Sequence, residues 1–433
     1  MTHPVKWAPV LSGSAADLAT EAIRAIAGDL CHLVETAESG SSGHSWFGLD
    51  GYAGIALFLS YFERSGLSLP TQDAVPAALD LAIENLRTVH ALPALHGGFT
   101  GLAWTIEHFL KSDSDPDDPG REIATRLEEY LDSSPWTRDY DLIAGLAGFA
   151  VWARERMPSP LGADCLARIV ARFAETAEQR PDGISWRTRP EHLSPDEEKR
   201  FPEGNFNLGV AHGVPGALGA LAVAYAAGVE RETARKLIEG GVSWLLAQRL
   251  PEEAVSRFPY HVWPGTEPKP TGLGWCYGDL GITATLLDVA RRLGRADWER
   301  AALDLGRKSA LRPLPFPDLS AAKTSGDACV CHGAAGNGHL FHRLFHATGD
   351  AVFADAARTW FARALDLREP GNGIGGYLFW EPDNDGNMVR KASPGLLNGA
   401  AGVGLALLAA VTEVEPEWDR PLLASIPTGD GSS

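Results

Sequence analysis

A glycine pair separated by two residues, Gly-x-x-Gly, recurs seven times along this 433-residue chain. The second glycine of each pair stands at position 54, 101, 148, 216, 281, 336 or 402, and a largely apolar stretch follows it. Successive second glycines are 47 to 68 residues apart, which leaves enough chain for two helices and their loops. The sequence therefore predicts a repeat protein built from seven two-helix units.

Amphipathic stretches lie between the glycine pairs. Residues 75–89 and residues 165–177 each place their large apolar side chains on one face of a helix. The stretches after the glycine pairs are apolar on nearly all sides, which is typical of helices buried all round. We therefore expect an all-α fold, an α/α toroid with about seven inner and seven outer helices. The repeats run from about residue 45 to 412, inside a single domain over residues 1–433.

The glycine pairs suit the starts of the inner helices. Glycine permits tight turns and close backbone approach, so the seven helix N-termini can converge at one mouth of the ring, where free N–H groups favour anions. The alternative is that the glycines only let helices pack closely. Four longer segments, rich in Pro, Gly and charge, are expected to contact substrate at this mouth: residues 179–207, 250–274, 312–328 and 369–395. The last of them predicts a small hairpin around Asp385-Gly386.

Composition excludes several classes of protein. The net charge of −18 and the pI near 5.2 argue against a nucleic-acid binder. The N-terminus has no signal-peptide pattern, and the apolar run at 216–229 is too short to span a membrane. Five cysteines are an odd number that suits free thiols or a metal site better than disulfides. We expect a cytoplasmic protein in a reducing compartment.

Three soft or imidazole side chains stand just before two consecutive glycine pairs. Cys276 precedes the fifth pair and Cys331-His332 precedes the sixth, so neighbouring repeats would bring them together. Two thiolates and one imidazole form a zinc site with an open fourth position, which is the pattern of catalytic zinc. The alternative is that the cysteines are buried as small apolar residues.

Other side chains could also take part in a metal site. Cys329 could replace Cys331 as a ligand or be inert. His339, His342 and His346 lie at helical spacing in the sixth inner helix. Histidines at that spacing, without carboxylates nearby, more often reflect packing.

Three further residues occupy equivalent positions before glycine pairs. His212 directly precedes the fourth pair, Asp141 opens the segment ahead of the third, and Tyr277 follows Cys276. Taken singly, each suits a structural role, such as a helix cap for the aspartate. Together beside a zinc ion they would supply groups for proton transfer. His96 has a comparable place in the second repeat.

The combination of these motifs resembles the lanthipeptide (lantibiotic) cyclase family over nearly the whole chain. The motifs that carry the resemblance are AHGVPG, WCYGD, CHGAAG and LLNGAAGVGLAL. The resemblance implies an α/α toroid, a zinc ion held by Cys276, Cys331 and His332, and catalytic positions at His212, Asp141 and Tyr277.

The family's reaction adds a peptide cysteine thiol to a dehydroalanine or dehydrobutyrine and so closes a lanthionine or methyllanthionine thioether ring. The resemblance implies a dehydrated precursor peptide, made of leader and core, as substrate. It also implies a separate dehydratase as partner, since no dehydratase domain precedes the repeats. We expect a cytoplasmic enzyme, and a membrane-associated biosynthetic complex is compatible with that location.

One position departs from the family pattern. Family members often carry an Arg four residues before the cysteine of WCYG, where this chain has Gly272. Lys269 or Arg257 are candidates to replace that charge. Two alternatives stay open: a zinc-dependent thiol alkylase of the prenyltransferase type, and a non-catalytic peptide-binding toroid. The precursor, ring pattern, stereochemistry and oligomeric state, and the choice between acid and base for His212, are likewise left open by the sequence.

Overall fold

The computed structural model describes residues 6–37, 46–68, 73–88, 91–110, 119–312, 326–383 and 385–428. The chain divides into two compact units. The first unit comprises Met1–Ala91, Gly306–Asp419 and Thr428–Ser433, and the second comprises Leu92–Leu305 and Arg420–Pro427. The single domain expected from the sequence stays a prediction.

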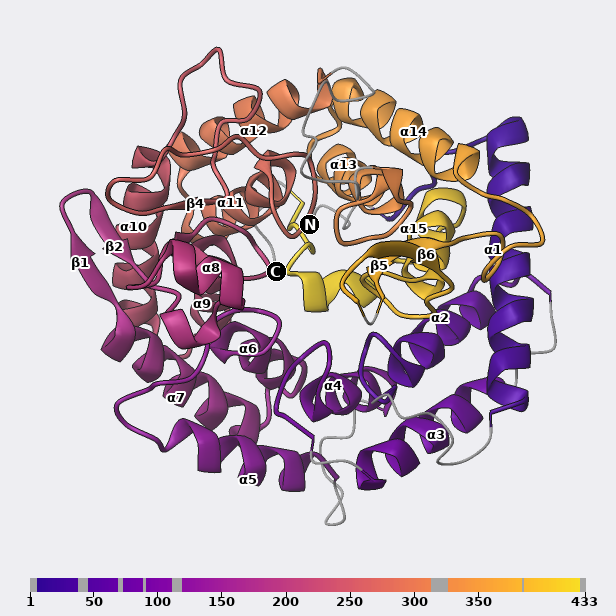
Figure 1. Ribbon diagram of the computed structural model, residues 1–433, viewed down its shortest axis with the longest axis horizontal. Helices are drawn as coiled ribbons and strands as arrows, with labels where there is room; N and C mark the ends of the chain where they lie inside the picture. The colour runs from indigo at the N-terminus through magenta and orange to yellow at the C-terminus, as the bar shows by residue number, and fades with distance from the viewer. Residues whose placement is uncertain are drawn as a thin grey trace. The chain divides into compact units, whose positions relative to one another are not determined.

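The first unit is built from paired helices (Figure 1). Helix α2 packs on α3, α13 on α14 and α1 on α15, while α15 also packs on α2 and α13. Every residue of α15 from Ala400 to Ala410 is buried, whereas α3 buries only four of its residues. The helices are α1 (Gly13–Glu35), α2 (Tyr52–Arg64), α3 (Ala74–Thr88), α13 (Ala334–Thr348), α14 (Ala351–Asp366) and α15 (Ala400–Val411).

The second unit repeats this arrangement. Helices α6, α9 and α11 are largely buried. Helix α9 packs between α6 and α11, α4 packs on α6, and the outer helices α7 and α10 cover α6 and α9. Helix α12 (Ala296–Ala310) begins in this unit, and the division between the two units falls within it, after Leu305. The helices are α4 (Phe99–Leu110), α5 (Pro119–Leu131), α6 (Leu146–Glu155), α7 (Pro160–Thr176), α9 (Val214–Ala226), α10 (Arg231–Ala247) and α11 (Asp279–Leu293).

The predicted inner helices are confirmed as helices that begin at the glycine pairs. Helices α2, α4, α6, α9, α11, α13 and α15 each start directly after the first glycine of a pair. The second glycine is required by a close approach of the preceding loop. A Cβ atom at Gly148 would lie 2.6 Å from the carbonyl oxygen of Leu142, which is closer than atoms of this kind can pack. The loop before α6 is therefore folded back over the first turn of that helix.

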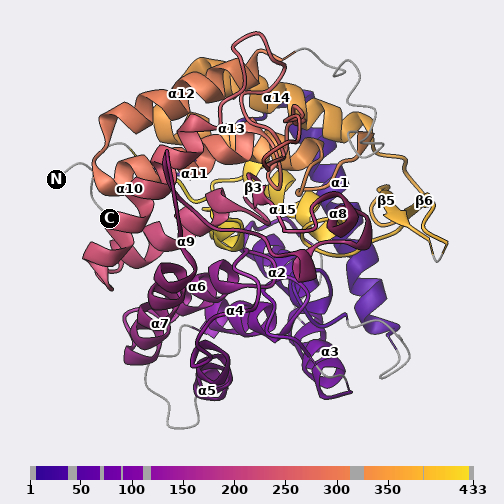
Figure 2. The same ribbon diagram turned by 60° about the vertical axis from the view of Figure 1, so that its left-hand side comes forward.

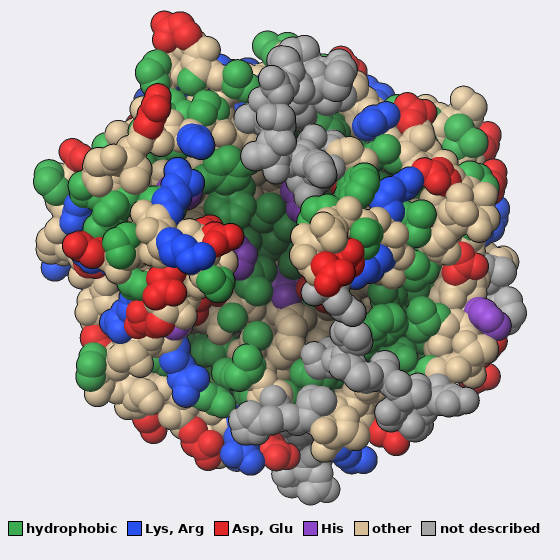
Figure 3. Space-filling model, viewed as in Figure 1, with side chains coloured by type: hydrophobic (Ala, Val, Ile, Leu, Met, Phe, Trp, Pro, Cys, Tyr) green, Lys and Arg blue, Asp and Glu red, His purple; other side chains and the backbone are tan. Residues whose placement is uncertain are grey.

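The longer segments contain short elements that the sequence did not predict. Residues 179–207 and 250–274 carry most of the antiparallel pairs β1 (Glu178–Arg180) with β2 (Gly183–Ser185) and β3 (Phe206–Asn207) with β4 (His261–Val262). The short helices η1 (Pro190–His192) and α8 (Pro195–Arg200) lie between them. Strands of two or three residues are too short to display a period-two pattern. Over α8, whose residues after Pro195 are all charged, acidic and basic side chains lie next to each other on the surface (Figure 3).

The predicted hairpin around Asp385-Gly386 is confirmed. Strands β5 (Phe379–Pro382) and β6 (Met388–Lys391) pair in antiparallel register, with Pro382 opposite Met388. The hairpin projects from the helices of the first unit (Figure 2). Of the segment 312–328, residues 313–325 lie outside the described residues. A last short helix, η3 (Glu417–Leu422), follows α15.

Candidate active site and metal centre

A histidine and an aspartate from two neighbouring helix starts form a close pair. His212 directly precedes Gly213, the N-cap of α9, and Asp141 lies in the loop before α6. The Nδ1 atom of His212 lies 2.6 Å from Oδ2 of Asp141. The other carboxylate oxygen of Asp141 accepts a hydrogen bond from the backbone N–H of Ala144, at 2.8 Å. The aspartate is thus fixed by the turn that precedes α6.

This pair is buried at one end and open at the other. The side chain of Asp141 is 3% exposed and that of His212 is 45% exposed. Burial lowers the pKa of His212, but the hydrogen bond and the charge of Asp141 outweigh it and raise the pKa above 6.5. With Nδ1 held by the carboxylate, Nε2 is the nitrogen through which the ring can exchange a proton with a substrate.

Tyr277 lies beside the histidine, and its hydroxyl is oriented by an amide. The ring centroids of His212 and Tyr277 are 6.2 Å apart, and the ring planes are inclined by 29°. Asn207 donates a hydrogen bond from Nδ2 to the Tyr277 hydroxyl oxygen at 2.8 Å, while its own Oδ1 accepts from the N–H of Gly209. Burial raises the pKa of Tyr277. The hydroxyl therefore keeps its proton and can donate it in a hydrogen bond to a substrate oxygen.

Asn207 was not among the residues expected at the site from the sequence. It stands in β3, five residues before His212 and outside the glycine pairs. In the sequence, a polar residue of a two-residue strand cannot be distinguished from an ordinary loop residue. The one signal was its place in a segment expected to line the mouth.

The loop that carries Cys276 is packed against the loop that carries His212. The N–H of Ala211 donates to the carbonyl oxygen of Cys276, at 3.4 Å. A Cβ atom at Gly209 would lie 2.5 Å from that same oxygen, so this close approach requires glycine. Cys276 is half-buried, and a thiolate at this position would raise the pKa of His212. The second unit therefore brings Cys276, Tyr277, His212 and Asp141 together.

The other two expected ligands lie in the first unit, at the start of α13. Cys331 and His332 directly precede Gly333, the N-cap of that helix. The N–H groups of Val330 and Cys331 both donate to the carbonyl oxygen of Leu397, at 3.0 Å. Cys331 is 9% exposed and His332 is half-buried. The loop before α15 thus holds the backbone of this segment, in which Cys331 is buried and His332 half-buried.

Two further residues of the same loop stand close to His332. Ligand atoms of Asp327, Cys329 and His332 lie within 4.8 Å of one another. The Asp327 carboxylate accepts hydrogen bonds from the N–H groups of Cys329 and Trp380, at 3.1 Å and 3.0 Å. Burial raises the pKa of Asp327, which the charge of His332 partly opposes. Thiol, imidazole and carboxylate groups at one loop are a donor set that suits zinc.

Comparison with known proteins identifies the family. Residues 48–423 match the family described as "Lanthionine synthetase C-like protein". The chain belongs to this family. The nisin biosynthesis protein NisC of Lactococcus lactis subsp. lactis is 24% identical over 269 residues, covering 55% of this chain and 61% of NisC. The solved structure of nisin cyclase superposes with a TM-score of 0.72 at 19% identity, covering 93% of this chain and 96% of that chain.

The comparison also decides the fold class. The likeness to nisin cyclase confirms the α/α toroid expected from the glycine repeats. The chain spans 61% of the length of the curated NisC sequence that it matches. In the described part of this lanthionine synthetase C-like protein, no helix is both long and apolar enough to cross a membrane.

The remaining histidine candidates have structural partners. Nε2 of His339 lies 2.8 Å from Oδ2 of Asp419, and Nε2 of His342 lies 2.9 Å from the carbonyl oxygen of Ala8. His342 and His346 pack on the ring of Trp7, with centroids 4.2 Å and 4.8 Å away. The spacing of these histidines therefore serves the packing of Trp7, Ala8 and Asp419 against α13.

His96 is also enclosed. It is 1% exposed, and its ring centroid lies 6.0 Å from that of Trp275. Burial, and next the charge of His212, lower the pKa of His96 to about 3. The ring therefore stays neutral at physiological pH.

The two residues considered as substitutes for the family arginine differ in their surroundings. The Arg257 guanidinium donates to the carbonyl oxygen of Leu250, at 2.7 Å. The backbone N–H of Arg257 donates to the carboxylate of Asp279, the first residue of α11. Lys269 is exposed. Burial and then the charge of Arg200 lower the pKa of His261, and the charge of Lys269 adds a smaller effect in the same direction. A stabilising charge from Lys269 remains a prediction.

Proposed function

We propose that this protein is a lanthipeptide cyclase that adds a peptide cysteine thiol to a dehydroalanine or dehydrobutyrine of the same precursor peptide. The observation that carries the proposal is the contact of 2.6 Å between His212 and Asp141, with Tyr277 alongside. Membership of the lanthionine synthetase C-like family supports the same reaction.

The residues of the second unit suit the proton transfers of this addition. The thiol sulfur bonds to the β-carbon of the dehydro residue, and the electron pair of the C=C bond moves toward the carbonyl oxygen as an enolate. Protonated His212 then delivers a proton from Nε2 to the α-carbon, while Asp141 stabilises the imidazolium. The Tyr277 hydroxyl can donate a hydrogen bond to the enolate oxygen. The thiol proton is lost and the α-carbon gains one, so no atom is released.

We propose that Cys276, Cys331 and His332 hold a zinc ion. Two thiolates and one imidazole leave a fourth position for a ligand from substrate, as in catalytic zinc sites. A zinc ion bound there would favour the thiolate form of the substrate cysteine at neutral pH. Asp327 lies within 4.8 Å of His332 and is proposed to orient that imidazole, as carboxylates commonly do for metal-binding histidines.

The substrate of this proposed reaction is a precursor peptide whose Ser or Thr residues have already been dehydrated. A dehydratase is therefore the proposed partner, because the dehydro residues must be formed before the thiol can add to them. We propose a cytoplasmic site of action, which a membrane-associated complex with the dehydratase would also allow.

Ring formation can be tested by counting thiols, since cyclisation leaves the peptide mass unchanged. The dehydrated peptide is incubated with the protein and then treated with a thiol-alkylating reagent. We expect one alkylation to be lost for each ring formed. An increase in mass that requires an isoprenoid diphosphate would indicate a prenyltransferase-type alkylase instead. Tight peptide binding without loss of thiols would indicate a non-catalytic peptide-binding toroid.

A further inference from the structure

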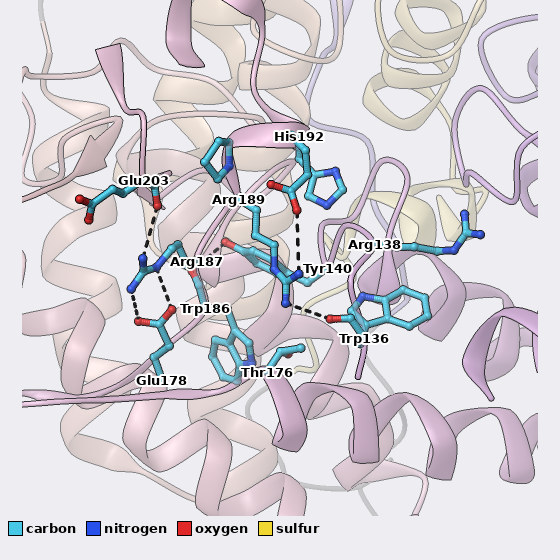
Figure 4. A pocket seen from close by; sticks show the side chains of 12 residues that line it. Trp136, Arg138, Tyr140, Thr176, Glu178, Trp186, Arg187, Arg189, His192 and Glu203 are labelled. Carbon is cyan, nitrogen blue, oxygen red and sulfur yellow. Dashed lines mark hydrogen bonds and ion pairs between the residues drawn. The ribbon is translucent and has the colours of Figure 1, made fainter. Parts of the chain in front are cut away.

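The second unit contains a cavity that the proposed chemistry does not use. Its volume is about 400 Å³, which lies in the usual range for ligand pockets. It is formed by the loop that leads from α5 to Asp141 and by the segment that runs from the end of α7 through β2 to η1 (Figure 4).

The walls of the cavity are rigid aromatic side chains. Trp136, Tyr140 and Trp186 are each no more than 4% exposed. Their polar atoms are bonded within the wall: the Tyr140 hydroxyl donates to the carbonyl oxygen of Trp186, and the Trp186 indole N–H donates to that of Phe173. The Trp136 indole N–H donates to the carbonyl oxygen of Asp139. These walls are therefore preformed, and specific polar contacts must come from other residues.

One arginine of the cavity is held in place by the protein itself. Arg187 binds both carboxylate oxygens of Glu178, at 2.8 Å and 2.9 Å, and also donates to the carbonyl oxygen of Glu203 (Figure 4). Its guanidinium also stacks on the rings of Phe206 and Trp263. Its charge is neutralised by Glu178, so Arg187 serves as part of the wall.

A second arginine keeps donors for a ligand. Arg189 donates one hydrogen bond to the carbonyl oxygen of Trp136, at 3.1 Å. Glu191 forms an ion pair with Arg189 at 3.9 Å, but this exposed pair is too long for a hydrogen bond and contributes little, so it leaves the N–H donors of Arg189 unused. A guanidinium carries five N–H donors, and 40% of this side chain is exposed. Arg189 can therefore bind a carboxylate with two parallel hydrogen bonds.

The cavity and the proposed active site share one loop of the chain. Tyr140, which forms part of the wall, precedes Asp141, the partner of His212. Consecutive residues are about 3.8 Å apart between Cα atoms. A peptide that reacts beside His212 could therefore place a neighbouring side chain in the cavity.

We propose that this cavity binds an acidic side chain of the peptide substrate, an Asp or Glu a few residues from the reacting cysteine, through Arg189. The inference rests on the proposed cyclase function. Aromatic walls enclose the apolar part of such a side chain, and the guanidinium of Arg189 receives its carboxylate. The cavity would thus select which cysteine and dehydro residue are placed in the active site.

The test uses dehydrated peptides of one sequence, uncharged except for a single Asp moved along the positions that flank the ring-forming pair. Each Asp peptide is compared with a control peptide that has Asn at the same position. We expect Asp at one or two positions to lower KM on the order of tenfold, which is the effect expected of one charge-assisted hydrogen bond at a partly exposed site. The value of kcat should stay unchanged. The Arg189→Ala variant should lose this preference, whereas Arg235→Ala should keep it, because Arg235 lies on α10 and pairs with Glu239 outside the cavity.

Binding of the undehydrated peptides, measured by calorimetry, separates the two proposals. A preference for Asp that depends on Arg189, together with no ring formation from the dehydrated peptides, would support the cavity and refute the cyclase function. Ring formation with equal KM for Asp and Asn peptides at every position would refute the cavity and leave the cyclase function standing. A preference for Asp that is as strong in Arg189→Ala as in the wild type would also refute the role of the cavity. The Arg189→Lys variant and melting temperatures show whether loss of the bond to Trp136 has altered the fold.

Discussion

The Nδ1 atom of His212 lies 2.6 Å from Oδ2 of Asp141, although the two residues are 71 positions apart in the chain. The contact joins the start of α9 to the loop before α6. It is short for a neutral hydrogen bond and typical of a charge-assisted one. The geometry therefore supports an imidazolium stabilised by a buried carboxylate, which is the form of His212 needed to protonate an enolate.

Replacement of His212 by Asn should abolish most cyclisation without removing metal. We expect the rate to fall roughly 10² to 10⁴-fold, the usual contribution of a positioned acid or base. Zinc content should stay near that of the wild type, because the side chain is outside the proposed ligand set. Ring formation, zinc content and melting temperature are measured on the same variant. Loss of zinc would make His212 a ligand, and a lower melting temperature with normal turnover would give it a structural role only.

Replacement of Asp141 by Asn should move the pH dependence of the reaction. The pKa of His212 is raised above 6.5 in the folded protein, so the acid form is lost only as the pH rises through that raised value. In Asp141→Asn the alkaline limb of kcat should shift to lower pH. The bond from the N–H of Ala144 can be kept by the amide oxygen, which limits damage to the turn. A pH profile of kcat that is identical in both proteins would contradict the role of the pair.

The same pair predicts how stability changes with pH. Because folding raises the pKa of His212, the stabilisation that it contributes is fully present below pH 6.5 and is lost as the pH rises through the folded value. The difference in free energy of unfolding between wild type and Asp141→Asn should therefore shrink over that interval. Urea unfolding at several pH values measures it. A difference that grows with pH would show that the pair acts in the opposite sense.

Removal of the Tyr277 hydroxyl should slow cyclisation less than loss of His212. Tyr277→Phe keeps the ring beside His212 but removes the donor proposed for the enolate oxygen. Loss of one such donor costs roughly 10² to 10³ in kcat in a well-formed oxyanion site. Asn207→Ala should lower kcat in the same direction, because the amide orients the hydroxyl. Tyr277→Phe with normal kcat would remove the hydroxyl from the mechanism.

Zinc content should distinguish the proposed ligands from nearby residues that do not bind the metal. Cys276→Ala, Cys331→Ala and His332→Ala should each lose most of one equivalent of zinc, measured by elemental analysis after chelator washing. Cys329→Ala should keep it. Asp327→Asn should weaken zinc binding by roughly 10 to 100-fold, as expected for a residue that orients a metal-binding histidine. Full zinc retention in Cys276→Ala and Cys331→Ala would refute the site, and equal loss in Cys329→Ala would require another ligand set.

The sequence by itself determined the helical repeats and the starts of the inner helices. The repeated glycine pairs are local signals, since a loop that folds back on a helix requires glycine at that position, as at Gly148. The motifs around Cys276 and Cys331 likewise pointed to a family, which the comparisons confirm. The hairpin at Asp385-Gly386 could be predicted for the same reason, because turn chemistry resides in adjacent residues.

Only the tertiary structure decided which polar residues meet. Asn207 bonds to Tyr277 across 70 positions, and His339 bonds to Asp419 across 80, yet neither contact leaves a pattern in the sequence. The cavity beside Arg189 arises in the same way, because its walls come from two segments that are unremarkable when read separately. Periodicity reports how each helix is buried, but the pairing of side chains depends on how loops fold over those helices, and that is decided by long-range packing.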